Sequence, residues 1–374
     1  MNSALVCRRC STRPAVWGSP ARGVWHGRHV QESAPNRRHV VGYASNKAVV
    51  IKGFDVKDPL SQIEVLDLSM PSPAVDEVLV RITLRPVHPA DVSFAKGFVS
   101  DPSSYSFPTV LGIEGVGEVA KIGAGVKGLK VGDRVVTLGG YNTEHWQQYA
   151  VRKSSDVFVV PDDVSEESAC QLYVNPLTAI GMLDILDIPK GGFLLQTCGT
   201  SCLARIIEDL AKHRGVDVIN VVSRPEAVAE LKSKGSDHVV LSGTGDLLER
   251  VKDITSGEKV DAAIDALAGS STSEVATAVR DRGTVLVYGA LTSRKIQVSV
   301  FDIVVREISL KGFTLPRWRS EDQGRVNEKL KEVISMADKV FVPWSGEKFV
   351  LEDAKEAILA SQARGRGGKV LLEG

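Results

Sequence analysis

The chain has 374 residues, which is long for one ordinary domain and comfortable for two. Hydrophobic residues make up 43% and charged residues 25%, a balance that excludes a wholly disordered chain and a disulfide-stapled miniprotein. Lys plus Arg and Asp plus Glu both total 46, so no global basic field indicates a nucleic-acid partner. No apolar run is long enough to suggest a membrane span.

The first 46 residues differ from the rest in charge. They contain seven arginines and one acid, Glu32, with no Lys and no Asp. Arg-rich, acid-poor N-termini are typical of organelle transit peptides, so we expect a mitochondrial leader that ends near residues 38–46. A plastid leader and a disordered basic tail are the alternatives. Cys7 and Cys10 form a CxxC pair here, but no second pair completes a zinc site, and we expect no metal.

Residues 47–173 have the pattern of a β-rich domain. Short Val/Ile runs such as Lys47–Lys52 and Glu77–Leu84 are bounded by Gly, Pro and Asp. From Gly112 to Gly125, five of fourteen residues are glycine. This density of short strands and glycine turns favours a partly open barrel over a parallel sheet.

Residues 174–316 alternate between strands and helices. A helical period covers Ser165–Leu186, and the short apolar strand Phe193–Leu195 follows it. Four further strands are expected, at Val216–Val222, His238–Leu241, Ala262–Asp265 and Thr284–Tyr288. The helices between them are expected at Leu203–His213, Pro225–Lys234, a segment ending at Ile254, and Ser271–Arg280. Continuous apolar strands separated by helices predict a doubly wound parallel sheet of the Rossmann type, and thus an α/β fold.

The last part of the chain, residues 317–374, contains two expected helices and one strand. The helices lie around Val326–Lys339 and Leu351–Ser361, and the strand is Lys369–Leu372. The sequence nearby offers this terminal strand no partner. We therefore expect it to return to the sheet of residues 47–173, and we assign residues 317–374 to that domain.

The turn after Phe193–Leu195 is made of small residues and leads into a helix. Gly199, Thr200 and Ser201 lie in it. Such a turn lets backbone N–H groups and a helix N-terminus face a pyrophosphate, although a full G-x-G-x-x-G is absent and an ordinary tight connection is the alternative. Ser223 and Arg224 follow where an NAD site would place Asp or Glu. A hydroxyl and a cation fit the 2′-phosphate of NADPH better than the bare ribose of NADH, so we expect NADPH.

Several motifs in chain order resemble one protein family. They are HPAD (His88–Asp91), GIEGVGEV (Gly112–Val119), VGDRV (Val131–Val135), VNPLTA (Val174–Ala179), INVV (Ile219–Val222), TVLVYG (Thr284–Gly289) and LKGFTLPRW (Leu310–Trp318). From about Lys47 onward, the chain resembles the zinc-independent branch of the medium-chain dehydrogenase/reductase superfamily. Within that branch it is most similar to the mitochondrial trans-2-enoyl-CoA reductases. The metal-ligand His of the zinc-dependent alcohol dehydrogenases is replaced by Ile113.

The resemblance implies a GroES-like barrel domain beside the Rossmann domain. It also implies NADPH-dependent reduction of trans-2-enoyl thioesters, carried on coenzyme A or an acyl carrier protein, in mitochondrial fatty acid synthesis. Homodimers are usual in the superfamily. The resemblance implies cofactor contacts at Asn175, Thr178 and Phe313, with an ordinary helix start at the Asn-Pro pair as the alternative for the first two. Tyr288 and Gly289 end a parallel strand on the side of the sheet where ligands bind, so we expect cofactor contacts there as well. The stretches Arg317–Arg319 and Arg364–Lys369 are either solvated faces or contacts for a pantetheine-linked phosphate.

The sequence departs from the family at the proton donor. Family members carry a tyrosine in a G-x-Y motif, but the equivalent residues here are Gly97, Phe98 and Val99. Tyr105 on the same loop could replace the missing hydroxyl, or His88 could supply a proton or orient the nicotinamide. A packing role for each is the alternative. A catalytically silent subunit of a larger mitochondrial assembly and a quinone or enone oxidoreductase therefore remain open.

Overall fold

The computed structural model describes residues 45–99, 101–138, 144–342 and 344–374. The chain divides into two units, Met1–Gly42 and Tyr43–Gly374, and only the second is described below. The predicted leader, with Cys7 and Cys10, lies outside the described residues. None of the described helices is long and apolar enough to cross a membrane.

Two mostly antiparallel sheets form the β-rich part of the described chain. A small sheet has the order β2-β1-β4, and a seven-stranded sheet has the order β15-β16-β3-β5-β6-β8, with β7 paired to β3. The small sheet consists of β1 (Ser45–Ile51), β2 (Ile63–Ser69) and β4 (Thr109–Val110). The larger sheet consists of β3 (Glu77–Pro86), β5 (Val116–Ile122), β6 (Arg134–Thr137), β7 (Tyr149–Lys153), β8 (Val157–Val159), β15 (Ser345–Val350) and β16 (Lys369–Glu373). These strands build the GroES-like barrel that the sequence predicts.

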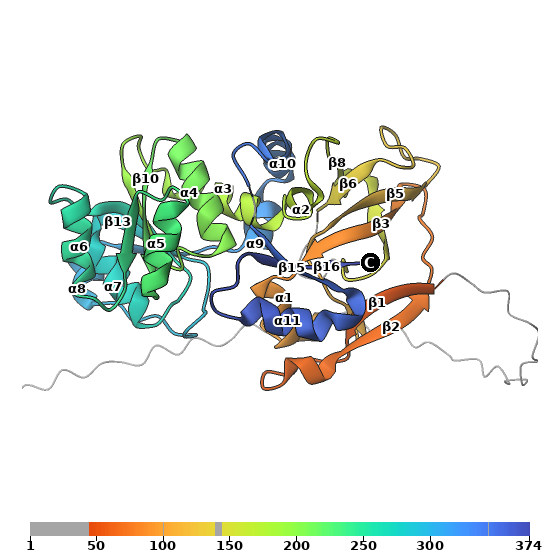
Figure 1. The fold of residues 1–374 in the computed structure, drawn as a ribbon, viewed down its shortest axis with the longest axis horizontal. Coiled ribbons are helices and arrows are strands. Elements are labelled where there is room, and N and C mark those ends of the chain that lie inside the picture. Colours follow the sequence, from red (N-terminus) through yellow and green to blue (C-terminus); the bar gives the residue numbers. More distant parts are fainter. Residues whose placement is uncertain (1–44, 100, 139–143, 343) are drawn as a thin grey trace, which may run out of the picture. The chain divides into compact units, whose positions relative to one another are not determined.

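A six-stranded sheet in the order β11-β10-β9-β12-β13-β14 forms the Rossmann part, and all its pairings are parallel. Its strands are β9 (Phe193–Gln196), β10 (Asp217–Val222), β11 (His238–Leu241), β12 (Val260–Asp265), β13 (Val279–Val287) and β14 (Ser309–Gly312). Helices α3 (Val174–Leu186), α4 (Cys202–His213) and α5 (Pro225–Ser233) form one layer, and α6 (Leu247–Ile254) and α7 (Ser270–Ala278) pack together as another (Figure 1). The predicted doubly wound sheet is confirmed.

Helix α4 shows how the sequence determines these elements. The Ser201 side chain accepts a hydrogen bond from the Ala204 backbone N–H and caps the helix N-terminus. Buried apolar residues then recur on one face, and Lys212 and His213 occupy the last turn, where cations favour the helix dipole. Gly215, with a φ of 75°, follows the helix.

The terminal strand returns to the barrel sheet, as the sequence predicts. β16 pairs antiparallel with β3 and parallel with β15, and the three strands lie together in Figure 1. Val370 and Leu372 of β16 share one hydrophobic core with Phe94 of α1 (Pro89–Ala95) and with Ile358 of α11 (Ala354–Gln362). The last residues of the chain are therefore part of the barrel core.

Several elements differ from the sequence prediction, among them α1, β14 and β15, which the sequence did not predict, and the two discussed next. The helix expected over Ser165–Leu186 is interrupted between α2 (Glu166–Ala169) and α3. The reason is Pro176, which is tolerated in the first turn of α3 but would clash with the Leu172 carbonyl in one continuous helix. The short helix α8 (Val300–Val304), with mostly exposed apolar side chains, was not predicted.

Candidate functional site

The turn between β9 and α4 contains Gly199, Thr200 and Ser201, as predicted. A Cβ on Gly199 would lie 2.8 Å from the Cβ of Asn220 on β10, so only glycine lets the turn approach that strand. The preceding residue, Cys198, has a φ of 56°, and the Thr200 side chain has no hydrogen bond within the described residues. The helix N-terminus is thus presented by small residues, the arrangement that suits a bound anion.

The carboxyl ends of β9, β12 and β13 meet beside this turn. The Thr197 hydroxyl donates to Asp265 Oδ1 at 3.0 Å and accepts from the Ala266 backbone N–H at 2.9 Å. A Cβ on Gly289 would lie 2.6 Å from the Ala266 carbonyl oxygen, so the end of β13 also requires glycine. Burial, together with Cys198 and Asp265, raises the pKa of the Tyr288 hydroxyl, which places that hydroxyl near the turn.

Ser223 and Arg224 follow β10 at the predicted position for a 2′-phosphate contact. Ser223 is exposed and Arg224 is partly exposed. The Arg224 guanidinium lies beside Gly365, and its Nη2 atom is 3.9 Å from Glu230 Oε2. A carboxylate therefore stands close to the predicted phosphate-binding cation, on the helix that follows the strand.

Asn175 and Thr178 lie one turn apart on α3. They are 6% and 8% exposed, and neither side chain has a hydrogen bond within the described residues. Neither has an unpaired polar atom that is fully enclosed. Both side chains are nearly buried, keep some access to solvent and have no partner among the described residues. This environment is consistent with the predicted cofactor contacts.

Phe313 occupies a different environment from the other predicted cofactor residues. It is 6% exposed and belongs to the largest hydrophobic core. Its ring packs on Gly181 of α3, where an added Cβ would lie 2.9 Å from Phe313 Cε2 and 3.0 Å from Trp318 Cδ2. Core packing accounts for the ring, and the predicted cofactor contact of Phe313 stays a prediction.

His88 belongs to a buried polar cluster that joins four segments of the chain. Its Nε2 atom is 2.5 Å from Glu114 Oε1, and its Nδ1 atom is 2.8 Å from Lys369 Nζ, the first residue of β16. The other carboxylate oxygen of Glu114 accepts from the backbone N–H groups of Tyr173 and Val174, at 3.1 and 2.7 Å. The cluster therefore joins the start of α1, the loop before β5, the start of α3 and the terminal strand.

Charge balance assigns the protons in this cluster. An ammonium group only donates, so His88 Nδ1 accepts from Lys369 and His88 Nε2 donates to the Glu114 carboxylate. Burial and the Lys369 charge lower the pKa of His88, against the opposing effect of Glu114. Both ring nitrogens are occupied in this neutral tautomer. The geometry thus favours a positioning role for His88 over direct proton donation. Both roles stay predictions.

Lys369 is 4% exposed, and its ammonium group has one hydrogen bond within the described residues, to His88. Its backbone N–H donates to the Trp344 carbonyl oxygen at 2.6 Å, and Cys202 Sγ, at the start of α4, is 3.9 Å from that same oxygen. Burial lowers the pKa of Lys369, whereas Cys202, Glu114 and Asp91 favour its charged form. The backbone of Lys369 thus lies close to the first residue of α4, and its buried ammonium group, held by His88, keeps donors that have no acceptor within the described residues.

Tyr105 packs into an aromatic cluster at the end of a short helix, Pro102–Ser104. Its ring centroid is 5.0 Å from that of Phe94 and 5.8 Å from that of Phe54, both edge-on. Val99 packs against the same apolar core. No hydrogen bond of the Tyr105 hydroxyl is found within the described residues, and no described contact joins Tyr105 to His88. The structure therefore does not bring the two predicted catalytic side chains together.

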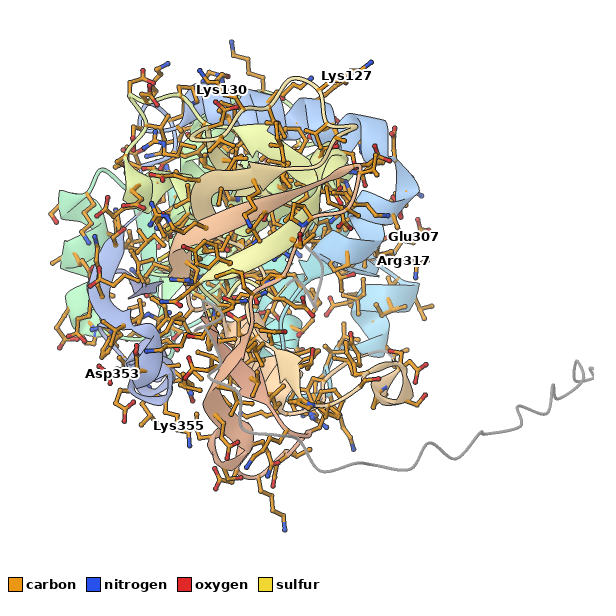
Figure 2. The ribbon with its side chains drawn as sticks, turned by 90° about the vertical axis from the view of Figure 1, so that its right-hand side faces the viewer. Lys127, Lys130, Glu307, Arg317, Asp353 and Lys355 are labelled. Carbon is orange, nitrogen blue, oxygen red and sulfur yellow. The ribbon has the colours of Figure 1, made fainter. Side chains whose placement is uncertain are left out.

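The two basic stretches also separate in the structure. Arg317 is exposed on α9 (Leu315–Glu321) and points outward in Figure 2. Arg319 instead donates to the Tyr173 hydroxyl at 3.3 Å and lies 3.6 Å from Asp156. Arg366 donates to the Ser361 carbonyl oxygen. Lys369, in the second stretch, is buried, which the sequence did not indicate.

Glu114 and Asp265 are site residues that the sequence did not single out, and Lys369 was expected only as part of a basic stretch and not in the buried cluster with His88. Each is a charged residue within an apolar or glycine-rich segment: GIEG, KVLL and AAID. Such a residue is either buried with partners or functional, so this pattern was the available signal. In the described part of the chain, no group of three or more His, Cys, Asp or Glu side chains could hold a metal ion.

Comparison with protein families gives two matches in the order of the fold. Residues 74–162 match the alcohol dehydrogenase GroES-like domain, and residues 205–338 match the zinc-binding dehydrogenase model. The first range covers β3 to β8 of the barrel part, and the second covers β10 to β14 of the Rossmann sheet.

Individual relatives agree with the families. The chain is 30% identical over 292 residues to the mitochondrial enoyl-[acyl-carrier-protein] reductase of Arabidopsis thaliana, which covers 76% of this chain and 75% of that protein. It is 28% identical to the enzyme of the same name from Dictyostelium discoideum, over 79% of this chain and 86% of that protein. A solved structure described as an NADPH:quinone reductase from Bacillus thuringiensis superposes with a TM-score of 0.80 at 27% identity, over 88% of this chain and 99% of that one. The chain therefore belongs to the medium-chain dehydrogenase/reductase superfamily and, within it, resembles the mitochondrial enoyl reductases.

Proposed function

We propose that the chain is an NADPH-dependent reductase of trans-2-enoyl thioesters carried on coenzyme A or an acyl carrier protein. The observation that carries the proposal is the turn of small residues that leads into α4, with the backbone of the buried Lys369 close to the first residue of that helix, in a chain whose relatives are named enoyl-[acyl-carrier-protein] reductases. A helix N-terminus and a cation with unused donors suit the two negative charges of a pyrophosphate.

The residues that the structure presents fit a dinucleotide. Gly199, Thr200 and the first backbone N–H groups of α4 would hold the pyrophosphate together with Lys369. Asn175 and Thr178, whose side chains have no hydrogen bond within the described residues, would meet the polar groups of the nicotinamide half. Ser223 and Arg224 would receive the 2′-phosphate, which supports NADPH over NADH.

Bound NADPH would supply the hydride that reduces the β-carbon of the thioester, and the chain must then provide a proton for the α-carbon. Neutral His88 keeps the Lys369 ammonium in place and remains hydrogen-bonded itself, so we assign it a positioning role. The hydroxyl of Tyr105 has no partner within the described residues, and we propose it as the donor in place of the hydroxyl missing at Val99. A positioned donor of this kind also stabilises charge that develops on the thioester.

Two alternatives rest on specific observations. A catalytically silent subunit of a mitochondrial assembly is favoured by Val99, which has no hydroxyl, and by the packing of Tyr105 against Phe54 and Phe94. A quinone or enone oxidoreductase is favoured by the similarity to a protein named NADPH:quinone reductase. The oxidoreductase alternative keeps the proposed NADPH site and differs in the acceptor, whereas the silent subunit reduces no acceptor.

The proposal extends to location and organisation. The Arg-rich residues 1–46, together with the names of the relatives, support a cleaved transit peptide and a place in the mitochondrial matrix, in fatty acid synthesis. We further propose that residues 47–173 and 317–374 form the substrate domain and residues 174–316 the NADPH domain. N-terminal sequencing of the protein from its native source tests the leader, and a sequence starting at Met1 would exclude cleavage.

The test of function is NADPH oxidation with crotonyl-coenzyme A and with a longer trans-2-enoyl-coenzyme A. It compares the unaltered chain with Tyr105→Phe and Val99→Tyr. Loss of one positioned donor costs about 100- to 1000-fold in rate, so Tyr105→Phe should lower turnover to that degree. Tyr105→Phe keeps the ring in its aromatic cluster and therefore separates chemistry from packing.

The outcomes distinguish the candidates. An inactive unaltered chain that gains activity in Val99→Tyr would identify a silent scaffold. Turnover that Tyr105→Phe leaves unchanged would exclude Tyr105 as the donor. Oxidation of NADPH by a quinone, with no reaction of either thioester, would favour the oxidoreductase alternative. A fluorescence titration that shows no NADPH binding at millimolar cofactor would exclude both redox roles and leave the silent subunit.

A further inference from the structure

Phe98 and Arg294 form a contact between two loops that are distant in the sequence. The guanidinium carbon of Arg294 lies 3.5 Å from the centroid of the Phe98 ring, well within the range of a cation–π interaction. Phe98 follows α1 and directly precedes Val99, whereas Arg294 lies on the loop after β13. The stack therefore joins the barrel part of the chain to the Rossmann part.

Arg294 is a cation without an acidic partner. It is exposed, and no carboxylate of the described residues forms an ion pair with Arg294 or with its exposed neighbour Lys295. Other arginines of the same region are paired: Arg282 with Glu307 at 2.8 Å, and Arg306 with Asp302 at 2.6 Å. Two adjacent positive charges at this loop are thus left for a ligand.

The loop that carries Arg294 is held in place by its backbone. The Gly269 N–H donates to the Lys295 carbonyl oxygen at 2.9 Å, and the Gln297 N–H donates to the Gly269 carbonyl oxygen at 3.0 Å. The Ser293 hydroxyl bonds to both backbone groups of Lys295. A guanidinium stacked on a ring and carried by a pinned loop loses little freedom when an anion binds.

The position of the stack relates it to the reaction. The loop follows the carboxyl end of β13, the edge of a doubly wound sheet where ligands bind. Phe98 lies next to Val99, on the loop that bears the proposed donor Tyr105. Phe98 is 42% exposed and Leu291, on the Arg294 loop, is 61% exposed. An apolar surface with two adjacent cations thus borders the region of the proposed chemistry.

We propose that Arg294, held over Phe98 and assisted by Lys295, binds the phosphate of the 4′-phosphopantetheine arm that carries the acyl thioester. The inference rests on the proposed function, because it takes the thioester carrier as the ligand. The guanidinium offers a planar set of donors that matches a phosphate, and the exposed rings and aliphatic groups suit the uncharged remainder of the arm. Coenzyme A and an acyl carrier protein share this arm.

The test is calorimetric titration of the full chain, saturated with NADPH, with 4′-phosphopantetheine and with pantetheine, which lacks the phosphate. We expect the unaltered chain to bind the phosphorylated arm about tenfold or more tightly, and Arg294→Gln to remove that difference. Arg294→Lys, which keeps the charge but not the planar donors, should retain part of it. Arg282→Gln, which changes an exposed arginine in the first half of β13, is the matched control and should leave both affinities unchanged.

Two results would overturn the proposal: equal affinity of the unaltered chain and Arg294→Gln for 4′-phosphopantetheine, or an equal loss of affinity for pantetheine, which would reduce the stack to a structural contact. Further titrations with coenzyme A and with a pantetheinylated carrier protein identify which source binds more tightly. The reductase function fails separately: Arg294-dependent binding without NADPH oxidation by crotonyl-coenzyme A would retain this site and exclude the reductase. Turnover of crotonyl-coenzyme A with a KM that Arg294→Gln leaves unchanged would support the reductase and exclude this phosphate site.

Discussion

The carboxyl group of Asp91 lies in the same buried cluster as His88 and Lys369. Its Oδ2 atom accepts the His88 backbone N–H at 2.7 Å, and its Oδ1 atom is buried without a hydrogen bond in the described residues. Burial raises the pKa of Asp91 to about 7 from an ordinary value of 3.8, although the His88 N–H and Lys369 act in the opposite direction. The folded protein therefore holds a proton between these two pH values that the unfolded chain has released.

This proton makes a signed prediction about stability. Because the folded pKa is the higher one, the contribution of Asp91 is fully present below about pH 4 and is lost as the pH rises through about 7. Asp91→Asn keeps the acceptor for His88 and does not titrate. Urea unfolding at pH 5 and pH 7 should show the unaltered chain losing up to about 2 kcal/mol relative to Asp91→Asn. A constant difference between the two proteins across this range would contradict the assignment.

Arg224, the predicted contact for the 2′-phosphate, has the carboxylate of Glu230 beside it. Glu230 Oε2 is 3.9 Å from Arg224 Nη2, and its Oε1 is 2.9 Å from Lys234 Nζ. A charge-assisted contact to the 2′-phosphate contributes about 1.5–3 kcal/mol, so Arg224→Ala should weaken NADPH binding about tenfold or more and leave NADH unchanged. Glu230→Gln removes a competing carboxylate and should strengthen NADPH binding up to about fivefold. Fluorescence titrations measure both, and equal affinities of the unaltered chain for the two cofactors would refute NADPH preference.

Helix α3 shows an element whose packing overrides its intrinsic propensity. Gly181 lies in the middle of α3, where alanine would be favoured by about 1 kcal/mol. A Cβ there would lie about 3 Å from the rings of Phe313 and Trp318. Overpacking a core costs about 1–3 kcal/mol, so we expect Gly181→Ala to lower the free energy of unfolding by about 1–2 kcal/mol in urea titrations.

Gly324 is the matched control for this substitution. It lies exposed in the first turn of α10 (Gln323–Met336), and the nearest atom to an added Cβ is Asp322 Oδ1 at 3.3 Å. Gly324→Ala should therefore leave stability unchanged or raise it by up to about 1 kcal/mol. Two stabilising substitutions, at Gly181 and at Gly324, would show that the contact with Phe313 does not limit α3.

The sequence predicts elements much better than it predicts pairs of side chains. The alternation of strands and helices, the small residues of the β9–α4 turn and the return of β16 all depend on local pattern, and each is found in the structure. The contact of His88 with Lys369 joins residues that are 281 positions apart, and no local pattern encodes it. The ring packing of Phe313 on Gly181 and of Tyr105 on Phe94 likewise depends on contacts that the local sequence does not encode, and the predicted ligand contacts of both residues stay predictions.

At the scale of the whole molecule, the Rossmann part has an exposed apolar helix, α8, and an open sheet edge, β14. Val300, Phe301, Val304 and Val305 are 75%, 58%, 68% and 62% exposed, and β14 is the last strand of the six-stranded sheet. An open strand edge beside an apolar surface is a site of association, and a two-fold axis would satisfy both chains at once. We therefore expect a homodimer that pairs these surfaces.

Light scattering during gel filtration tests this expectation. The unaltered chain should elute as a dimer, and the double substitution Phe301→Asp with Val304→Asp should give a monomer, because charged groups cannot be buried against a second copy. Leu359→Asp is the control, since Leu359 on α11 is also 58% exposed but lies away from this edge. A monomeric unaltered chain would exclude the dimer, and a monomer produced equally by Leu359→Asp would exclude this surface.

The position of β16 has a consequence for how the protein is made. A ribosome synthesises β3 and His88 long before β16 and Lys369, which pair with them from 281 residues further along. Until then, the growing chain can complete its Rossmann sheet, while the end of β3 lacks its partner β16. The hydrophobic core around Phe94 also lacks Val370 and Leu372. A precursor that enters an organelle N-terminus first, as the proposed leader requires, would remain incompletely folded and easily threaded until its last strand has passed. That strand also brings Lys369 close to the turn between β9 and α4, where we propose that NADPH binds. The cofactor would therefore bind only chains in which β16 is in place.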